Sequence, residues 1–259
     1  MSITAARRNK VAKKLLSQGS VQVGELATEF SVSTETIRKD ILYLEKKGVA
    51  IKTHGGALIA GSMLSIEQSI ERKTNKNIDL KTRIAHRALE LIPEKAVIIL
   101  DSGSTVQCLT ELLSTKSGFT IFSNAYNSGA ILSQSNNDFY LLGGKLLPHS
   151  MAMVGHWANN LLSSIKVDIC FIGTDGLLHS SGPCTASYEE AQIKQSMISS
   201  SQIRVLLSES SKFNNPGLFQ CCDWGEIDYF ITDDKISKDY VSAISAHTKV
   251  IVVPYKDFD

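Results

Sequence analysis

The sequence reads Val32-Ser33-Thr34-Glu35-Thr36-Ile37-Arg38-Lys39-Asp40 in one stretch and His54-Gly55-Gly56-Ala57 shortly after it. The first stretch predicts the start of a helix, because the Ser33 hydroxyl can accept a hydrogen bond from the first turn and Val32 can pack against Ile37. Apolar spacing predicts two shorter helices before it, one through residues 11–16 and one over about residues 23–30. Two helices joined by a turn of about three or four residues predict a helix-turn-helix.

The third helix has a polar and cationic face opposite its apolar residues Ile37, Ile41 and Leu44, and such a face suits the major groove of DNA. Residues 49–59 predict two short strands joined by a tight turn at residues 54–56, which together form a wing. The solvated face of an ordinary three-helix bundle would have the same periodicity, so the wing is what favours DNA binding. The residues that we expect at the DNA are Ser33, Thr34, Glu35, Thr36, Arg38, Lys39, Tyr43, Lys52, His54 and Gly55.

Charge is distributed unevenly along the chain, although the net charge at neutral pH is only +1. Residues 1–57 contain ten basic and five acidic side chains, whereas the remaining residues contain 17 basic and 21 acidic ones. A basic surplus confined to the N-terminal end favours contacts with the phosphate groups of double-stranded DNA.

Composition excludes several other classes of protein. No apolar run approaches the roughly 20 residues that span a bilayer, and the charged N-terminal residues are not followed by an apolar stretch. The five cysteines are scattered without a Cys-x-x-Cys pair, and the histidines lack the spacing of metal ligands. We therefore expect a cytoplasmic protein with no membrane partner, no metal and no cofactor.

The chain of 259 residues is long enough for a small domain joined to a larger one. Residues 59–77 lose their periodicity and predict a linker, within which residues 66–72 can form a short helix. A helix follows from about residue 79, and beyond it apolar β-rich runs alternate with helical patterns, which predicts an α/β domain with a mainly parallel sheet. The predicted strands are residues 96–100, 119–122, 139–142, 167–172, 203–207, 229–231 and 250–253.

A turn of small and polar residues, Asp101-Ser102-Gly103-Ser104-Thr105, follows the first of these strands and leads into a helix. Backbone N–H groups and hydroxyls at the start of a helix can bind an anion, although a strand followed by a capped helix is also a common structural joint. Asn124 follows the second strand, at the end where open α/β sheets bind ligands. Gly143, Gly144 and Lys145 follow the third, where the glycines allow close approach of a ligand, although Gly143 fits a simple turn equally well.

Taken together, these motifs resemble the DeoR family of transcription regulators. The family's DNA-binding domain has a Ser-x-x-Thr-Ile-Arg-(Arg/Lys)-Asp helix and a His-Gly-Gly-Ala wing, which are residues 33–40 and 54–57 here. Its sensor domain has motifs in the same order as this chain, including an Asp-x-Ser-Lys-Phe motif that reads Glu209-Ser210-Ser211-Lys212-Phe213 here, with Glu in place of Asp. The second strand ends in Ser123-Asn124, where the family usually has Thr-Asn.

The resemblance implies a winged helix-turn-helix in residues 1–58, a linker in residues 59–77 and an effector-sensing α/β domain in residues 78–259, similar in fold to ribose-5-phosphate isomerase and the coenzyme A transferases. It implies a repressor of a carbohydrate-utilisation operon that a phosphorylated sugar releases from operator DNA. Because one small helix-turn-helix reads only a few base pairs, we expect a dimer or tetramer. The residues implied at the effector are Asp101, Ser102, Gly103, Ser104, Thr105, Asn124, Gly144, Lys145, Asp175, Glu189 and Lys212.

A sugar-phosphate isomerase is the alternative, because the implied fold is also that of an enzyme and fold does not fix function. Asp175, Glu189 and Lys212 are residue types that can act as acid and base in an isomerisation. An N-terminal DNA-binding domain would have no purpose in a simple isomerase, so we expect a regulator without enzymatic activity.

Overall fold

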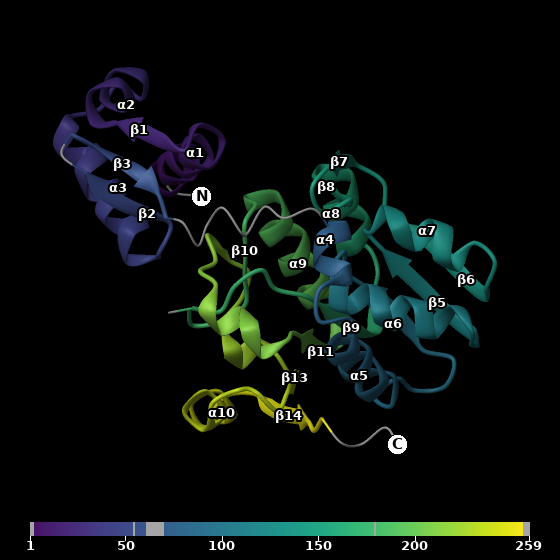
Figure 1. Ribbon diagram of the computed structural model, residues 1–259. Helices are drawn as coiled ribbons and strands as arrows, with labels where there is room; N and C mark the ends of the chain where they lie inside the picture. The colour runs from purple at the N-terminus through teal and green to yellow at the C-terminus, as the bar shows by residue number, and fades with distance from the viewer. Residues whose placement is uncertain (1–2, 54, 61–69, 179, 256–259) are drawn as a thin grey trace.

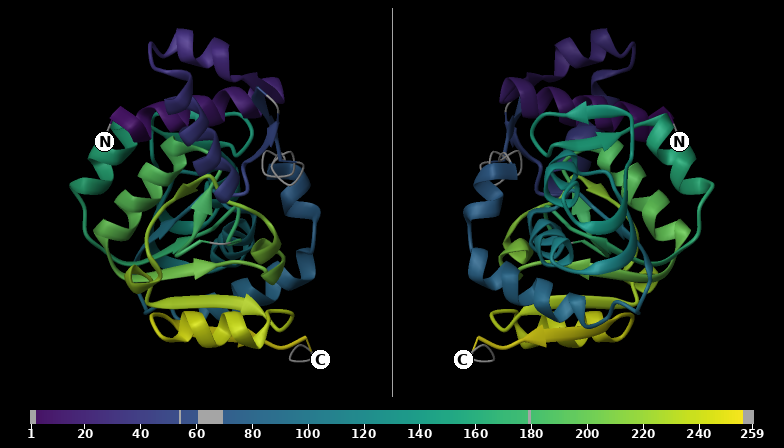
Figure 2. Two further views of the ribbon diagram at one scale, coloured as in Figure 1. Left: turned by 90° about the vertical axis from the view of Figure 1, so that its left-hand side faces the viewer. Right: turned by 90° about the vertical axis from the view of Figure 1, so that its right-hand side faces the viewer.

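The computed structural model describes residues 3–53, 55–60, 70–178 and 180–255 (Figure 1). His54, one of the predicted DNA contacts, lies outside the described residues, and so do residues 61–69 of the predicted linker. The N-terminal residues form a small domain at one end of the molecule, and the last helix and strand lie at the opposite end (Figure 2).

The N-terminal domain is a winged helix-turn-helix, as predicted. Its elements in chain order are α1 (Ile3–Gln18), β1 (Ser20–Gln22), α2 (Val23–Glu29), α3 (Thr34–Lys46), β2 (Ala50–Thr53) and β3 (Gly56–Ile59). The wing strands β2 and β3 pair antiparallel, and β1 pairs with the other edge of β3. The short strand β1 was not predicted, because three residues are too few to show a strand periodicity.

The core of this domain joins the three helices. Val11, Leu15 and Ile37 are fully buried in it, and burying each such side chain contributes about 1.5 to 3 kcal/mol. Asp40 is also buried, and its carboxylate accepts hydrogen bonds from Arg7 Nε at 2.6 Å and Arg8 Nε at 2.9 Å. These two ion pairs fasten α1 to α3.

The second domain is built on a seven-stranded sheet whose described strand pairs are all parallel, so the predicted α/β class is confirmed. The strand order is β14-β13-β11-β9-β4-β5-β6. The strands are β4 (Val97–Leu100), β5 (Ser117–Ser123), β6 (Asn136–Leu141), β9 (Val167–Ile172), β11 (Ser201–Leu207), β13 (Tyr229–Asp233) and β14 (Lys249–Val253). The chain builds outward from β4 in one direction and from β9 in the other, so the order reverses between these two strands, which is where doubly wound sheets bind ligands.

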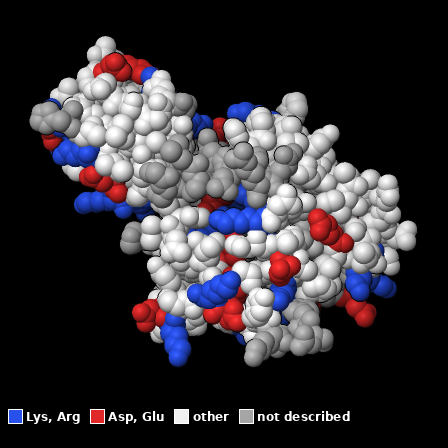
Figure 3. Space-filling model, viewed as in Figure 1, with Lys and Arg blue, Asp and Glu red and all other residues white. Residues whose placement is uncertain are grey.

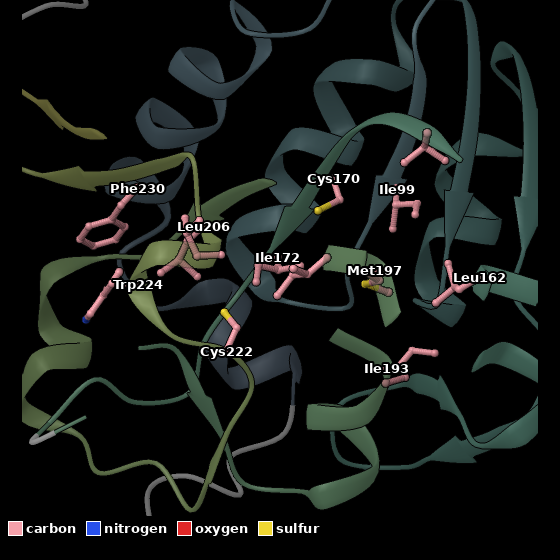
Figure 4. Packing of buried hydrophobic residues seen from close by; sticks show 14 of the residues in the cluster. Ile99, Leu162, Cys170, Ile172, Ile193, Met197, Leu206, Cys222, Trp224 and Phe230 are labelled. Carbon is pink, nitrogen blue, oxygen red and sulfur yellow. The ribbon is translucent and has the colours of Figure 1, made fainter. Parts of the chain in front are cut away.

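Helices cover both faces of the sheet. One face packs against α5 (Ile78–Leu89), α6 (Ser104–Ser114) and α7 (Tyr126–Leu132), and the other packs against α8 (His156–Ser163), α9 (Tyr188–Ser200) and α10 (Lys238–Ser245). Successive strand residues alternate between the two faces, as Ile98 and Ile99 do on β4. Figure 4 shows the hydrophobic core between the sheet and α8 and α9. Ile99, Cys170 and Leu206 of the strands face Leu162, Ile193 and Met197 of the two helices.

Short elements complete the domain near the ends of the central strands. They are α4 (Ile70–Asn75), β7 (Lys145–Leu147), β8 (Ala152–Val154), β10 (Cys184–Thr185), β12 (Phe219–Gln220) and two 3₁₀ helices, Ser210–Asn214 and Trp224–Glu226. The helix α4 lies within the segment predicted as a linker. The buried Lys81 of α5 holds the C-terminal end of α4 in place, because its ammonium donates hydrogen bonds to the carbonyl oxygens of Lys73 and Lys76.

Candidate functional site

The helix α3 presents its predicted face to solvent. Ile37, Ile41 and Leu44 are buried, while Glu35, Arg38 and Lys39 are exposed. Thr34, Lys52 and Gly55 are exposed as well. This domain therefore has an accessible polar surface on α3 and the wing, and basic side chains gather along its lower left edge in Figure 3.

Ser33 and Thr36 have a structural contact at the start of α3. The Ser33 hydroxyl accepts a hydrogen bond from the backbone N–H of Thr36 at 3.2 Å, as the capping pattern predicted. The two hydroxyls also lie 2.8 Å apart. Because both residues lie at the exposed N-terminal end of the helix, the cap fixes the part of α3 that would enter a groove.

Tyr43 also has contacts outside its own helix. The guanidinium of Arg8 lies 4.1 Å from the centre of its ring. The ring also lines a cavity of about 350 Å³ together with Tyr188 and Leu218 of the second domain. Tyr43 thus lies at the domain interface while 40% of it stays exposed, and its contact with DNA stays a prediction.

A small cavity of about 40 Å³ opens at the reversal point of the sheet, between the ends of β4 and β9. The turn 102–105 lines it from β4, and Gly173, Thr174 and Asp175 line it from β9. Its other lining residues are Ile70, Lys73, Ser150, Thr185, Glu190, Lys194, Leu207, Ser208 and Lys212. The predicted residues Ser102, Gly103, Ser104, Thr105, Asp175 and Lys212 are therefore brought together, although they come from three separate segments.

The turn leaves backbone donors at the start of α6. Gly103 is the N-cap of this helix and has no side chain to accept hydrogen bonds from the first turn. The N–H groups of a first helical turn have no partner inside the helix, so here they are available to an anion. The turn also packs tightly, since a Cβ on Gly103 would lie 3.3 Å from the Cα of Gly173.

Asp101 does not line the cavity but contacts two residues that do. Its carboxylate is 1% exposed, forms an ion pair with the ammonium of Lys194, and accepts a hydrogen bond from Gly173 N–H at 2.9 Å. The prediction placed Asp101 at the effector. The structure places it at the joint between the ends of β4 and β9, where it contacts both cavity walls, and its contact with the effector stays a prediction.

Three lysines, Lys73, Lys194 and Lys212, and two acids, Asp175 and Glu190, line the cavity. Lys73 Nζ lies 2.7 Å from Asp175 Oδ1. Burial by itself raises the pKa of Asp175, but the ammonium groups of Lys73 and Lys212 outweigh burial and hold that pKa below its usual range. Burial lowers the pKa of Lys212, and the charge of Asp175 offsets this only in part.

Local structure fixes the place of Lys212. The 3₁₀ helix that carries it starts at Ser210, whose N–H and hydroxyl both donate to the carboxylate of Asp233 at 2.7 Å. Among the described residues, the Lys212 ammonium has no hydrogen bond or ion pair. Glu209, which replaces the family's Asp, accepts a hydrogen bond from Asn77 at 2.7 Å and does not line the cavity.

The two adjacent acids at the start of α9 point in different directions. Glu190 is buried in the cavity, where it accepts a hydrogen bond from the Thr185 hydroxyl at 3.1 Å. Burial, followed by the charge of Asp175, raises the pKa of Glu190. The predicted residue Glu189 lies outside this cavity, where its Oε1 is 3.1 Å from Nζ of Lys13 in the N-terminal domain.

A second chamber of about 540 Å³ adjoins the small cavity. Lys73, Ser150, Asp175 and Glu190 line both. The remaining walls of this outer chamber are Lys13, Leu16, Lys145, Leu147, Pro148, His149, Ala186, Ser187 and Glu189. In Figure 3 acidic and basic side chains lie next to one another in the middle of the face, between the two domains.

The remaining predicted residues divide between structural and exposed positions. Asn124 is fully buried, donates to the Met153 carbonyl oxygen at 3.4 Å, and lines neither chamber. Gly144 has φ +140°, and a Cβ there would lie 2.4 Å from the Val154 carbonyl oxygen, so a close backbone approach requires this glycine. Lys145 is exposed at the outer chamber, 3.8 Å from Glu189.

Sequence reasoning missed Lys73, Lys194 and Glu190. Lys73 lay in the segment predicted as a linker, and Glu190 and Lys194 lie on a helix from which only Glu189 was assigned to the effector. Across the described ranges, no cluster of His, Cys, Asp and Glu has the geometry to hold a metal ion. None of the helices described is both long and apolar enough to cross a membrane.

Comparison with known proteins gives matches along most of the chain. The DeoR-like helix-turn-helix domain matches residues 7–62, and the DeoR C terminal sensor domain matches residues 76–234. A putative aga operon transcriptional repressor of Escherichia coli O157:H7 is 34% identical over 253 residues, which are 96% of this chain and 94% of that protein. A lactose phosphotransferase system repressor of Staphylococcus epidermidis is 33% identical over 88% of this chain and 91% of its own length.

Among solved structures, ribose 5-phosphate isomerase A of Methanocaldococcus jannaschii is similar over 53% of this chain and 55% of its own, with a TM-score of 0.40 and 19% identity. A likeness at this level says nothing of activity. The sensor-domain match alone covers more than half of the chain, and both relatives match this chain over most of its length at more than 30% identity. The chain therefore belongs to the DeoR family, with a DeoR-like helix-turn-helix domain followed by a DeoR C-terminal sensor domain.

Proposed function

We propose that the chain is a DNA-binding transcription repressor of a sugar-utilisation operon and that a phosphorylated sugar releases it from DNA. Two relatives that match nearly full length are named as repressors of the aga operon and of a lactose phosphotransferase system. The exposed face of α3 and the wing supply the DNA-binding surface, and the cavity at the reversal point of the sheet supplies the sensor.

The observation that carries this proposal is that Lys212, whose ammonium has no hydrogen bond or ion pair among the described residues, lines the same cavity as the uncapped start of α6. A half-buried ammonium is only partly solvated by water, and a bound anion would supply the partner that it lacks among the described residues. A phosphate group in the turn 102–105 would accept hydrogen bonds from backbone N–H groups and hydroxyls, while Lys212 would supply a full positive charge. The turn and the lysine line the same cavity, as one anion site requires.

The sugar part would meet oxygen atoms that accept hydrogen bonds. Asp175 and Glu190 line the cavity next to the turn, and Ser150 lies at its border with the outer chamber. Sugar hydroxyls donate well to carboxylates. This set of residues therefore fits a phosphorylated polyhydroxy compound better than it fits free phosphate.

A sugar-phosphate isomerase remains the second candidate, and one observation favours it. Glu190 is a buried carboxyl group with a raised pKa beside the ionised Asp175, and environments that separate the pKa values of two acids occur in acid–base catalysis. A turnover assay with pentose and hexose phosphates separates the two candidates. Conversion of any of them at an enzymatic rate would reject the regulator-only proposal.

The variant Lys212→Met tests the proposed sensor, because it keeps the aliphatic stem and removes only the charge. Calorimetry with glucose 6-phosphate, galactose 6-phosphate, glucose and inorganic phosphate should find tighter binding of a phosphorylated sugar than of glucose by the parent protein. Lys212→Met should weaken that binding about 10- to 100-fold, the value of a hydrogen bond to a charged group, while DNA affinity stays unchanged.

The matched control is Lys238→Ala, which removes an exposed lysine at the start of α10 and should change neither binding. Equal affinity of the parent and Lys212→Met for the phosphorylated sugar would remove the proposed site. The expectation of a dimer or tetramer stays a prediction, which light scattering with and without operator DNA would test.

A further inference from the structure

We propose that the phosphorylated sugar occupies both chambers at once, so that its sugar end lies against α1 of the DNA-binding domain and separates Lys13 from Glu189. This inference rests on the proposed function, since it assumes that a phosphorylated sugar binds. It adds that the DNA-binding domain itself forms one wall of the site.

The sizes of the chambers require the ligand to extend outward. The inner cavity of about 40 Å³ has room for only a few water-sized groups, enough for the phosphate end of a ligand. The outer chamber of about 540 Å³ lies within the usual range of roughly 300 to 1,000 Å³ for small-molecule sites. The two adjoin at Lys73, Ser150, Asp175 and Glu190, so a sugar phosphate anchored in the turn can extend from the inner cavity into the outer chamber.

The far wall of the outer chamber belongs to the other domain. Lys13 and Leu16 of α1 line the chamber together with Ser187 and Glu189 of the sensor domain. Nζ of Lys13 lies 3.1 and 3.3 Å from the two carboxylate oxygens of Glu189, and the two side chains are 54% and 26% exposed. An ion pair this exposed contributes little to stability, so ligand hydroxyls can replace Lys13 at low cost.

Glu189 would keep a charge partner after Lys13 leaves. Lys145 Nζ lies 3.8 Å from the same Oε1, and the Ser187 hydroxyl donates to Oε2 at 3.0 Å. Both residues belong to the sensor domain, so they stay with Glu189 when the domains move apart. The contact between the domains can therefore open without leaving an isolated carboxylate.

A short segment connects the inner cavity to the domain interface. Asp175 Oδ2 accepts hydrogen bonds from the Thr185 hydroxyl at 2.8 Å and from Ala186 N–H at 3.1 Å. Ala186 packs, together with Leu218, against the core of the N-terminal domain. A ligand that engages Asp175 and replaces Lys13 would thus act on both ends of the segment 185–189, which gives its binding a direct mechanical path to the DNA-binding domain.

The test uses the full-length protein with Lys13→Met, Glu189→Gln and the double variant. Lys10→Met is the matched control, because Lys10 is an exposed lysine on the same helix that does not line the chamber. Binding to a duplex selected in vitro is measured with and without saturating glucose 6-phosphate or galactose 6-phosphate, whichever the parent binds tighter. Calorimetry gives the affinity for the same sugar phosphate in the absence of DNA.

We expect the sugar phosphate to lower the DNA affinity of the parent and of Lys10→Met by about 5- to 150-fold, the usual range of allosteric coupling. In Lys13→Met and Glu189→Gln the decrease should be at most about twofold, and the double variant should add nothing further, because both changes remove one interaction. Unchanged coupling in both single variants would overturn the inference, although the proposed function would stand. Absence of sugar-phosphate binding by the parent would overturn both.

Discussion

On α3, Arg38 and Glu35 approach to 3.6 Å with 56% and 63% of their side chains exposed, whereas the ion pair of Lys194 and Asp101 under the cavity is only 6% and 1% exposed. The DNA-binding surface therefore carries charges that water already solvates, and they can move to meet phosphate groups. The sensor cavity carries charges that the fold holds in place. Charged side chains on α3 are thus available to contact a ligand, whereas those under the cavity also stabilise the fold.

The difference has an energetic consequence. An exposed ion pair contributes about 0 to 1 kcal/mol, so its loss changes binding without changing the fold. Removing one member of a buried pair leaves an isolated charge in a medium that solvates it poorly. Substitutions of exposed charges on α3 should therefore change DNA binding, whereas substitutions of buried charges under the cavity should change the stability of the fold.

The largest effect is expected for Lys194→Met. This change leaves the Asp101 carboxylate buried without its ammonium partner, and such losses cost about 3 to 5 kcal/mol. Scanning calorimetry should show a lower unfolding temperature for the protein. The double variant Asp101→Asn with Lys194→Met should recover most of the loss, because it removes both charges and keeps an acceptor for Gly173 N–H. A Lys194→Met protein as stable as the parent would mean that the pair is not structural.

A smaller effect is expected for Arg38→Ala, and it should fall on DNA affinity and not on the stability of the fold. The side chain is exposed and lies off the buried stripe of α3, so the unfolding temperature should not change. If Arg38 contacts a base, the binding free energy for DNA should weaken by about 1 to 3 kcal/mol. If it contacts a phosphate group instead, the slope of log affinity against log salt concentration should decrease by about 1. Fluorescence anisotropy at several salt concentrations distinguishes the two.

Arg87→Ala is the matched control for Arg38→Ala. Arg87 forms the same kind of exposed pair, with Glu90 three residues further along a helix, but it lies on the sensor domain. Its loss should leave DNA binding untouched. If both variants weakened DNA binding equally, a general charge effect would replace the assignment of α3 as the recognition helix.

The same contrast explains which parts of the molecule the sequence could predict. Helical periodicity places Arg38 opposite Ile37 and Ile41 whatever the rest of the chain does, and the Ser33 cap is a local feature. The turn 102–105 is local too, since a strand, a small-residue turn and a helix follow one another. These features were predicted because each depends on neighbours within a few residues.

The cavity's charges depend instead on strand order. Lys73 meets Asp175 across 102 positions of sequence, and Lys194 meets Asp101 across 93. One sequence does not reveal which distant segments become neighbours. Helix α9 adds a second difficulty, because it buries Glu190 and Lys194 among apolar residues and so has no clear apolar stripe from which to orient Glu189.

The smallest expected effect concerns Glu190, a buried acid that lines the cavity, whereas Glu35 on the DNA-binding surface is exposed. Burial and the charge of Asp175 raise its pKa, while Lys194 and Lys73 act in the opposite direction. A group whose folded pKa is raised favours the folded state when protonated, so this contribution is present at low pH and is lost as pH rises through the folded pKa. Glu190→Gln keeps the shape and never ionises. Its unfolding temperature should therefore exceed that of the parent by a few degrees at neutral pH, and the difference should vanish in acid.

An anion probe sharpens this last prediction. Sulfate keeps the same charge from about pH 5 to about pH 8, unlike phosphate, so any pH dependence of its binding comes from the protein. An ionised Glu190 repels an anion in the cavity, whereas the protonated form does not. Sulfate should bind the parent more tightly as pH falls, and it should bind Glu190→Gln with a flatter profile that meets the parent's at low pH. Parallel profiles for the two proteins would show that Glu190 does not sense the anion and that the pH dependence arises elsewhere in the cavity.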